Sequence, residues 1–321
     1  MSKIGIVTPG GDAPGMNACI RAVVRTAILE GFDVFGIMRG WKGLIENEII
    51  KLTSRDMSGI INKGGTILKS QRFPEFKDRK IRETAIKNLI NRGIENLIII
   101  GGEGSLNAGL RISRESDINV IGIPASIDND VYGTEETIGF DTAVNTAVDA
   151  IDKIRDTATS HERIFIIEVM GRKHGFIALE VGIASGAEIV LIPEIPFNLK
   201  KVIDVLKKGI EKGKKSYIIV MAEGVGSSYT IGEKISRLLL HSEVRVTVLG
   251  YIQRGGKPTY FSRKLASIFG FNAVKLIASN KSKNKMITWN RGEIMIKDLS
   301  VVEKEKRIDF EFEEIIEILS S

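Results

Sequence analysis

Several residue types are scarce in this chain of 321 residues, and each scarcity excludes a class of protein. The single cysteine, Cys19, rules out an intrachain disulfide and fits a reducing compartment. Three histidines (His161, His174 and His241) and that one cysteine cannot make a zinc site of the usual kind. No stretch approaches the roughly 18 uninterrupted apolar residues that a membrane helix needs, so we expect no membrane partner.

The N-terminal segment and the charge limit the location and the partners. MSKIGIVTPGGD passes from one lysine into a short strand pattern and then into glycines, unlike a signal peptide, so we expect a cytoplasmic protein. The formal net charge is +6, which small anionic molecules explain as well as nucleic acid does. Because no basic block and no interleaving of basic with aromatic residues occurs, we expect no nucleic-acid partner.

Short β-rich runs alternate with helical periodicity almost from end to end. Several runs are apolar almost throughout, which is typical of a parallel sheet covered by helices on both faces. The alternation predicts an α/β, doubly wound fold, and the chain length suits two such units. The predicted strands span residues 3–8, 33–38, 96–101, 118–123, 163–169, 188–192, 216–222 and 244–249.

Glycines gather after predicted strands, where open α/β sheets bind their ligands. The loops are PGGDAPGMN (9–17), KGGT within 60–66, GGEGS (101–105) and MGRKHG (170–175). A glycine lets a phosphate approach the backbone, and the N-terminus of a following helix offers free N–H groups. One such loop could equally be a tight turn, but four of them favour a phosphate ligand.

Known phosphate-binding fingerprints narrow the choice of ligand. Gly102 and Gly104 supply the first two glycines of the dinucleotide pattern G-x-G-x-x-G, but Asn107 stands in place of the third, so NAD is discounted. A Walker A loop, the catalytic loop of protein kinases and a G-x-S-x-G elbow do not occur in the sequence.

Carboxylates and an arginine then point to phosphoryl transfer. Glu103 lies inside a phosphate-type loop, where it would repel phosphate unless Mg²⁺ lay between them. PASIDND places Asp128 and Asp130 just past a strand, although an Asx-rich turn would explain them too. With Arg172 after a further glycine, the sequence holds the metal site, the carboxylate base and the arginine that phosphoryl transfer uses.

Six motifs in order closely resemble the bacterial-type, ATP-dependent 6-phosphofructokinases. The resemblance covers residues 3–275, and the last 45 or so residues match loosely. It implies two similar Rossmann-like domains with mainly parallel sheets, and a homotetramer whose active sites are shared between subunits. The motifs are PGGDAPGMN (9–17), RFPEF (72–76), GGEGS (101–105), IDND (127–130), MGR (170–172) and IQRGG (252–256).

The resemblance also implies an activity and a division of labour between the domains. The activity is transfer of the γ-phosphoryl group of ATP to the 1-hydroxyl of fructose 6-phosphate, a committed step of glycolysis, with Mg²⁺ as cofactor. Residues 1–139 plus 252–303 would bind ATP and Mg²⁺, and residues 140–251 plus 304–321 would bind the sugar phosphate.

Roles carry over motif by motif. Asp128 would be the general base beside Ser126 and Asp130, while the Gly11 N–H and Arg172 would stabilise the transferring group. ATP would contact Gly11, Arg72, Phe73, Gly102, Glu103, Gly104 and Ser105, with the metal on Glu103. The sugar phosphate would contact Ser126, Ile127, Asp128, Met170, Gly171, Arg172, Glu223 and Tyr251. Its 6-phosphate would bind to Arg163, Arg245 and Arg254. The first two of these arginines would come from a neighbouring subunit.

An allosteric site at a subunit boundary is implied as well, for ADP as activator or phosphoenolpyruvate as inhibitor. Arg21 and Arg25 are four residues apart on a predicted helix and so share a face, although a solvated basic face would look the same. The implied residues are Arg21, Arg25, Arg55, Ser58, Arg155, Gly186, Glu188, Lys212, Lys214 and Lys215.

Several positions depart from the family pattern. The metal carboxylate is more often aspartate, and Glu103 is one methylene longer. Ala125-Ser126 replaces a common Gly-Thr before IDND, which keeps the hydroxyl. Tyr251 replaces a histidine that is usual before IQRGG.

Three alternative functions remain to be weighed. The pyrophosphate-dependent relatives tend to carry aspartate in place of Gly104 and lysine in place of Ala125, so both positions favour ATP. NAD and lipid kinases share a GGDG-type loop but lack the IDND, MGR and IQRGG motifs. A non-catalytic nucleotide sensor would have lost the base or the arginine, whereas Asp128 and Arg172 are both present.

Overall fold

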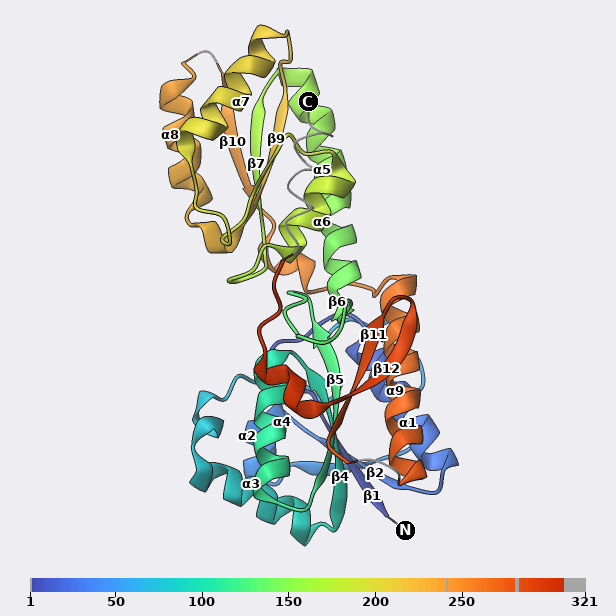
Figure 1. Ribbon diagram of the computed structural model, residues 1–321. Helices are drawn as coiled ribbons and strands as arrows, with labels where there is room; N and C mark the ends of the chain where they lie inside the picture. Colours follow the sequence, from blue (N-terminus) through green and yellow to red (C-terminus); the bar gives the residue numbers. More distant parts are fainter. Residues whose placement is uncertain (1, 241, 281–282, 309–321) are drawn as a thin grey trace. The chain divides into compact units, whose positions relative to one another are not determined.

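The computed structural model describes residues 2–240, 242–280 and 283–308 (Figure 1). The chain forms two compact units. The first contains the residues up to Thr142 together with Arg254–Lys306, and the second contains Ala143–Gln253 together with the described residues after Lys306. Residues 309–321 of the predicted second domain lie outside the described residues. Each unit is an α/β structure with a mainly parallel sheet, so the predicted fold class is confirmed.

The sheet of the first unit has the strand order β12-β11-β5-β4-β1-β2-β3, and β6 pairs with β5. Its centre is parallel, while β3 and β12 run antiparallel to their neighbours at the two edges. The strands are β1 (Lys3–Val7), β2 (Asp33–Ile37), β3 (Ile49–Leu52), β4 (Ile94–Gly101), β5 (Asn119–Ser126), β6 (Ile138–Gly139), β11 (Lys285–Asn290) and β12 (Glu293–Asp298).

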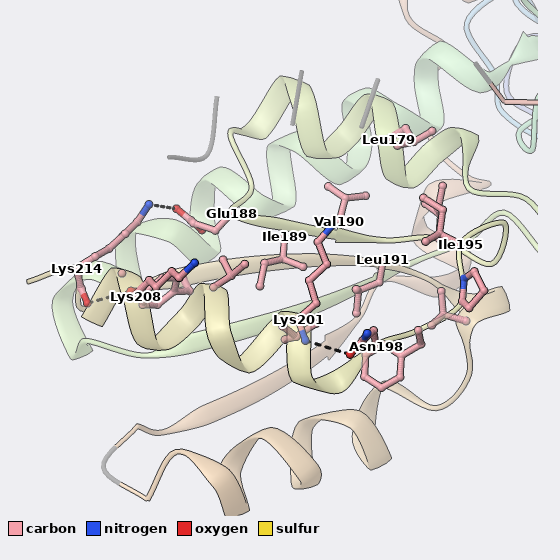
Figure 2. A pocket seen from close by; sticks show the side chains of 18 of the residues that line it. Leu179, Glu188, Ile189, Val190, Leu191, Ile195, Asn198, Lys201, Lys208 and Lys214 are labelled. Atoms are coloured by element: carbon pink, nitrogen blue, oxygen red, sulfur yellow. Dashed lines mark hydrogen bonds and ion pairs between the residues drawn. The ribbon is translucent and has the colours of Figure 1, made fainter. Parts of the chain in front are cut away.

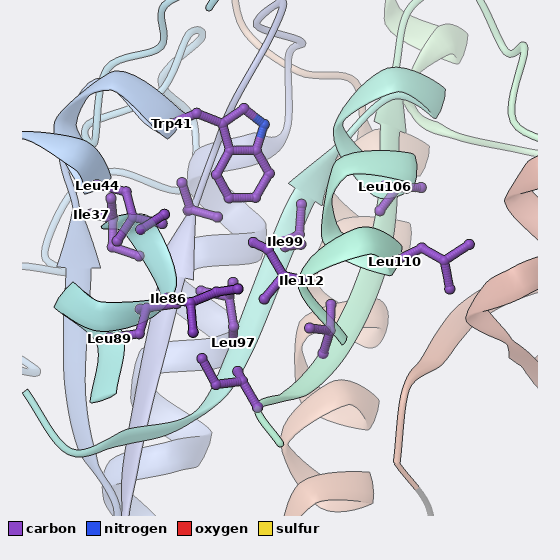
Figure 3. Close-up of a cluster of buried hydrophobic side chains, with 14 of the residues drawn as sticks. Ile37, Trp41, Leu44, Ile86, Leu89, Leu97, Ile99, Leu106, Leu110 and Ile112 are labelled. Carbon is purple, nitrogen blue, oxygen red and sulfur yellow. The ribbon is translucent and has the colours of Figure 1, made fainter. Parts of the chain in front are cut away.

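Helices pack on both faces of this sheet. On one face, apolar side chains of β4 meet those of α3 and α4, and Leu97, Leu89 and Leu106 are fully buried (Figure 3). On the other face α1 packs along α9, closely enough that a Cβ on Gly270 would lie 2.8 Å from the carbonyl oxygen of Cys19. The helices are α1 (Met16–Leu29), α2 (Gly40–Ile45), α3 (Arg79–Asn91), α4 (Glu103–Glu115) and α9 (Tyr260–Ser279), with 3-10 turns η1 (Pro74–Lys77) and η4 (Leu299–Glu303).

The second unit is built on four parallel strands in the order β10-β7-β9-β8. Its core contains buried side chains of the sheet and of α7 and α8, among them Ile219, Leu206 and Ile235. The elements are α5 (Phe140–His161), β7 (Ile164–Val169), α6 (Phe176–Ser185), β8 (Ile189–Leu191), α7 (Leu199–Glu211), β9 (Tyr217–Ala222), η2 (Glu223–Val225), α8 (Ser228–Leu238), β10 (Val244–Val248) and η3 (Gly250–Gln253).

Side-chain caps fix where several helices begin. Asp78 accepts from the Lys80 N–H ahead of α3, and Asn198 accepts from the Lys201 N–H ahead of α7. Such caps satisfy N–H groups that have no partner within the helix. None of the helices in the described part of the chain is both long and apolar enough to span a bilayer.

Candidate active site

Three segments that carry predicted site residues follow neighbouring parallel strands of the first unit. Strands β1, β4 and β5 are adjacent in the sheet, so their carboxyl ends lie at one edge. The segments that follow them are residues 8–12, 102–105 and 127–130. The sheet therefore places both glycine loops and the IDND motif at the same edge.

Contacts between these segments show how closely they approach. The Ser105 hydroxyl donates a hydrogen bond of 2.8 Å to the carbonyl oxygen of Pro9. A Cβ on Gly10, which has φ +91°, would lie 2.9 Å from Ser105 Oγ. A Cβ on Gly102 would lie 3.5 Å from Ser126 Cβ. Glycine at position 10 thus serves both the left-handed backbone and the close approach of the two loops.

Glu103 begins α4 and is exposed at the helix N-terminus, where a carboxylate is favoured by the helix dipole. The Asn107 amide, one turn later, donates a hydrogen bond of 2.7 Å to Glu103 Oε1. The described residues contain no group of three or more His, Cys, Asp or Glu side chains that could hold a metal alone. A lone carboxylate beside a phosphate-type loop fits Mg²⁺, which commonly takes one or two carboxylates plus phosphate oxygens.

Asp128 is buried, with 2% of its surface exposed, and local hydrogen bonds fix its position. Its backbone N–H donates to Ser126 Oγ at 3.2 Å, and that hydroxyl donates to Asp130 Oδ1 at 3.1 Å. Asn129 adopts φ +52° and donates to the carbonyl oxygen of Glu135 at 2.8 Å. The segment is therefore a hydrogen-bonded turn that also presents three polar side chains at the end of β5.

Arg254 and the segment before η1 lie against the first glycine loop. Arg254 Nη1 donates to the carbonyl oxygen of Asp12 at 3.0 Å, and a Cβ on Gly11 would lie 2.9 Å from the same nitrogen. The Ser70 hydroxyl donates to the carbonyl oxygen of Gly10 at 2.6 Å, which brings the segment leading to Arg72 beside this loop. Arg72 itself is exposed, and Phe73 is partly buried against the core.

In the second unit, Glu223 holds the MGR segment. Its Oε1 accepts hydrogen bonds from the backbone N–H groups of Gly171, at 3.2 Å, and Arg172, at 2.8 Å. Both residues have positive φ, +141° and +54°. The buried Gln253 accepts from the Met170 N–H at 2.9 Å. The carboxyl ends of β7 and β9 thus bring Met170, Gly171, Arg172 and Glu223 together.

Arg163 and Arg245 lie toward the opposite end of this sheet, where β7 and β10 begin. Arg163 directly precedes β7, and Arg245 is the second residue of β10. Both guanidinium groups form ion pairs with Glu243. Because β7 is six residues long, roughly 20 Å of strand separates Arg163 from Met170. One chain therefore does not bring these two arginines to the MGR segment. Tyr251, in η3, is exposed.

Part of the predicted allosteric set lies together in the second unit. Arg155 donates to the carbonyl oxygens of Ser185 and Gly186 at 2.7 and 3.0 Å. The buried Glu188 pairs with Lys214 at 2.9 Å and with Arg155 at 3.8 Å. Glu188 and Lys214 lie at one end of a largely apolar cavity of about 450 Å³ between α6, α7 and β8 (Figure 2), and Lys212 is also among the residues that line it.

The other predicted allosteric residues lie elsewhere. Lys215 pairs with Glu162 at 2.6 Å. Arg21 and Arg25 are on α1, and Arg55 and Ser58 share a turn after β3, in which the Ser58 N–H donates to the carbonyl oxygen of Arg55 at 3.1 Å. These four residues belong to the first unit.

The sequence interpretation missed three side chains that hold the site together. Ser70 and Gln253 bond to backbone groups far away in sequence; no local pattern marks Ser70, and the IQRGG motif contains Gln253 without indicating its partner. Asn107 stands in place of the third glycine of the dinucleotide pattern, and its spacing of four residues from Glu103 on a helix is the sequence signal for their contact.

Comparison with known proteins identifies the family of this chain. Residues 3–277 match the family described as Phosphofructokinase. A relative from Aquifex aeolicus, named ATP-dependent 6-phosphofructokinase, is 52% identical over 316 residues, which cover 96% of this chain and 97% of the relative. A relative of the same name from Thermoanaerobacter sp. (strain X514) is 49% identical over 321 residues, which cover 100% of both chains.

Solved structures share the fold. Phosphofructokinase from Saccharomyces cerevisiae superposes with a TM-score of 0.84 at 34% identity, covering 94% of this chain but only 44% of that one. A pyrophosphate-dependent phosphofructokinase from Marinobacter aquaeolei gives a TM-score of 0.86 at 24% identity, covering 97% of this chain and 86% of that one. At that identity the second match supports the fold alone. The chain therefore belongs to the phosphofructokinase family and is an enzyme of its bacterial, ATP-dependent type, as the six motifs predicted.

Proposed function

We propose that this protein transfers the γ-phosphoryl group of ATP to the 1-hydroxyl of fructose 6-phosphate, giving fructose 1,6-bisphosphate and ADP in cytoplasmic glycolysis. The observation that carries the proposal is the meeting of two glycine loops with the buried Asp128 at one sheet edge. The relatives from Aquifex and Thermoanaerobacter, near half identity over the whole chain, support the same donor and acceptor.

In this proposal each polar group has one task. The Asp128 carboxylate accepts the proton of the 1-hydroxyl, while Ser126 and Asp130 keep the turn in place. The backbone N–H of Gly11 and the guanidinium of Arg172 stabilise negative charge on the transferring group. Mg²⁺, when bound at Glu103, would neutralise charge on the ATP phosphates.

The sugar phosphate is bound mainly by the second unit in this scheme. Glu223 holds the backbone of Gly171 and Arg172 in the left-handed region, so the loop is already shaped before the sugar arrives. Arg163 and Arg245 lie at the opposite strand ends, so they can serve this sugar only from a second copy of the chain. That separation supports active sites shared between copies of the chain, and the proposed assembly, a homotetramer, is the one that the family resemblance implies.

Regulation is part of the same proposal. The cluster of Arg155, Glu188, Lys212 and Lys214 supports an anion-binding allosteric site for ADP or phosphoenolpyruvate. The resemblance assigns Arg21 to the same site from across a subunit boundary, so the test is Arg21→Ala, with rates measured over a range of ADP concentrations. We expect weaker activation and an unchanged maximal rate, and an unchanged activation curve would reject the assignment of Arg21.

The nearest alternative function, that of a pyrophosphate-dependent phosphofructokinase, differs in the phosphoryl donor. A Cβ added to Gly104 would meet no atom within 4 Å, so this position leaves open space beside the phosphate loop for a nucleotide. A coupled assay with fructose 6-phosphate and either ATP or pyrophosphate, each with and without Mg²⁺, tests the proposal. We expect turnover with ATP and Mg²⁺ only, and turnover with pyrophosphate alone would overturn it.

A further inference from the structure

Arg163 and Arg245 share one carboxylate, that of Glu243. Arg163 Nε donates to Glu243 Oε2, and Arg245 Nη2 donates to Glu243 Oε1. Each guanidinium therefore uses part of its donor set on a side chain of the same chain. The two contacts occupy both oxygens of the carboxylate.

The sheet register explains why these three side chains meet. Strands β7 and β10 pair in parallel, with Val244 opposite Ile164. The Ile164 N–H also donates to the carbonyl oxygen of Glu243 at 3.0 Å, so Glu243 lies beside Arg163. Arg245 is two residues after Glu243 and faces the same side of the sheet, because side chains alternate along a strand.

The cluster is accessible and carries an excess positive charge. Two guanidinium groups and one carboxylate leave a net charge of +1. The side chain of Arg163 is 25% exposed and that of Arg245 is 56% exposed. The hydrogen bond from Arg163 holds the pKa of the Glu243 carboxyl below its ordinary value, so the carboxylate is ionised at neutral pH.

We propose that Glu243 is an internal competitor of the sugar phosphate, because it occupies the guanidinium groups that would grip the 6-phosphate and thereby weakens substrate binding. This inference rests on the function proposed above, in which Arg163 and Arg245 bind that phosphate. A phosphate monoester carries about −1.5 to −2 charges and three acceptor oxygens, so it can displace a single carboxylate. The competing carboxylate raises the concentration of sugar phosphate at which the site fills.

The opposite role would be positioning, in which Glu243 holds the arginines ready for phosphate. The two roles predict opposite changes in the affinity for fructose 6-phosphate when the charge of Glu243 is removed. In Glu243→Gln the side chain keeps its size but loses its charge, so a competitor is removed and the arginines are released. We expect the affinity for fructose 6-phosphate to rise about three- to tenfold, the range that two partly exposed ion pairs allow. The effect falls on KM for the sugar rather than on kcat or on KM for ATP.

The experiment is calorimetric titration of the full-length protein with fructose 6-phosphate in the absence of ATP, together with steady-state kinetics. Glu243→Gln is compared with wild type, with Glu243→Ala, and with Glu233→Gln as a matched control. Glu233 is an exposed carboxylate of the same unit, paired at 3.8 Å with Arg237 on α8. Thermal melts establish that each variant is folded.

Tighter binding and a lower KM in both Glu243 variants, with an unchanged control, would support the proposal. Equal or weaker binding in a folded Glu243→Gln would overturn it, and weaker binding would assign Glu243 a positioning role instead. If wild type itself binds no fructose 6-phosphate, the proposed function fails, which is a different result from the failure of this inference.

Discussion

The side-chain amide of Asn107 donates a 2.7 Å hydrogen bond to Oε1 of Glu103, one turn earlier on α4. The same amide donates to the carbonyl oxygen of Val302 at 3.2 Å. Asn107 is thus anchored at η4 while it restrains the carboxylate proposed to bind Mg²⁺. The longer arm of Glu103, compared with the usual aspartate, is held at its end by this contact.

The first prediction concerns that contact. In Asn107→Ala the Glu103 side chain loses a restraint, so we expect the Mg²⁺ concentration for half-maximal rate to rise about two- to tenfold, because an exposed hydrogen bond of this kind contributes about 0.5–1.5 kcal/mol. Electron paramagnetic resonance of Mn²⁺ with a non-hydrolysable ATP analogue gives the same information without turnover. Ser113→Ala, on the same helix, is the control. An unchanged metal requirement would contradict the positioning role of Asn107.

The second prediction concerns the donor. Gly104 lies in the first turn of α4, where an acidic residue is favoured by the helix dipole and where a Cβ meets no neighbouring atom. Gly104→Asp should therefore fold with unchanged thermal stability. It should nevertheless raise KM for ATP, because the new carboxylate repels the nucleotide phosphates. A variant with wild-type KM for ATP would show that position 104 does not face the nucleotide.

The third prediction concerns the loop that Glu223 holds. Glu223→Ala removes the acceptor of two backbone N–H groups, at Gly171 and Arg172, from a loop with positive φ at both residues. We expect KM for fructose 6-phosphate to rise at least about tenfold, because hydrogen bonds to charged groups stabilise by about 1.5–3 kcal/mol each. Glu223→Gln keeps an acceptor oxygen, so it should raise KM for fructose 6-phosphate less than Glu223→Ala does. Equal sugar affinity in the alanine variant and wild type would argue against this role.

The fourth prediction concerns acid stability. Arg82 donates to both oxygens of Glu115, at 2.9 and 2.6 Å, and also to the carbonyl oxygens of Phe76 and Lys77 in η1. Because Arg82 is buried, Glu115→Gln should lower the free energy of unfolding by about 3 kcal/mol at pH 7. Glu83→Gln, in an exposed pair with Arg79, is the matched control and should change it by less than about 0.5 kcal/mol.

The sign of the pH dependence follows from the pKa of Glu115. The hydrogen bond from Arg82 lowers that pKa below the ordinary value of 4.5. The stabilisation is therefore fully present above pH 4.5 and is lost as the pH falls through the lower pKa of the folded state. Denaturant unfolding at a series of pH values should show the difference between wild type and Glu115→Gln shrinking in acid. A difference independent of pH would contradict the ion-pair account.

Much of the architecture could be predicted from the sequence because local patterns determine it. Each of the eight predicted strands occurs, since runs such as LIIIG are branched, apolar and bounded by glycine. The hairpin of β11 and β12 was missed. Its two-residue turn consists of Arg291 and Gly292, with φ +52° and +80°, and arginine is not the residue expected at such a position.

Contacts within the site were harder to predict, because they depend on sheet register. Glu243 and Arg163 are 80 residues apart and meet only because β7 and β10 pair with Val244 opposite Ile164. Likewise, the close approach of Gly11 to Arg254 requires the chain to return to the first unit after the second. Periodicity and motifs identify the elements and the loops, but they do not determine the pairing of distant strands.

The rate of the Asp128→Ser variant tests the central claim most directly. If Asp128 takes the proton of the 1-hydroxyl, kcat with ATP and fructose 6-phosphate should fall at least about 10²-fold, while the affinity for the sugar phosphate stays near that of wild type. Asp117→Ser, at an exposed position between α4 and β5, should keep the wild-type rate. A folded Asp128→Ser variant with wild-type kcat would contradict the account.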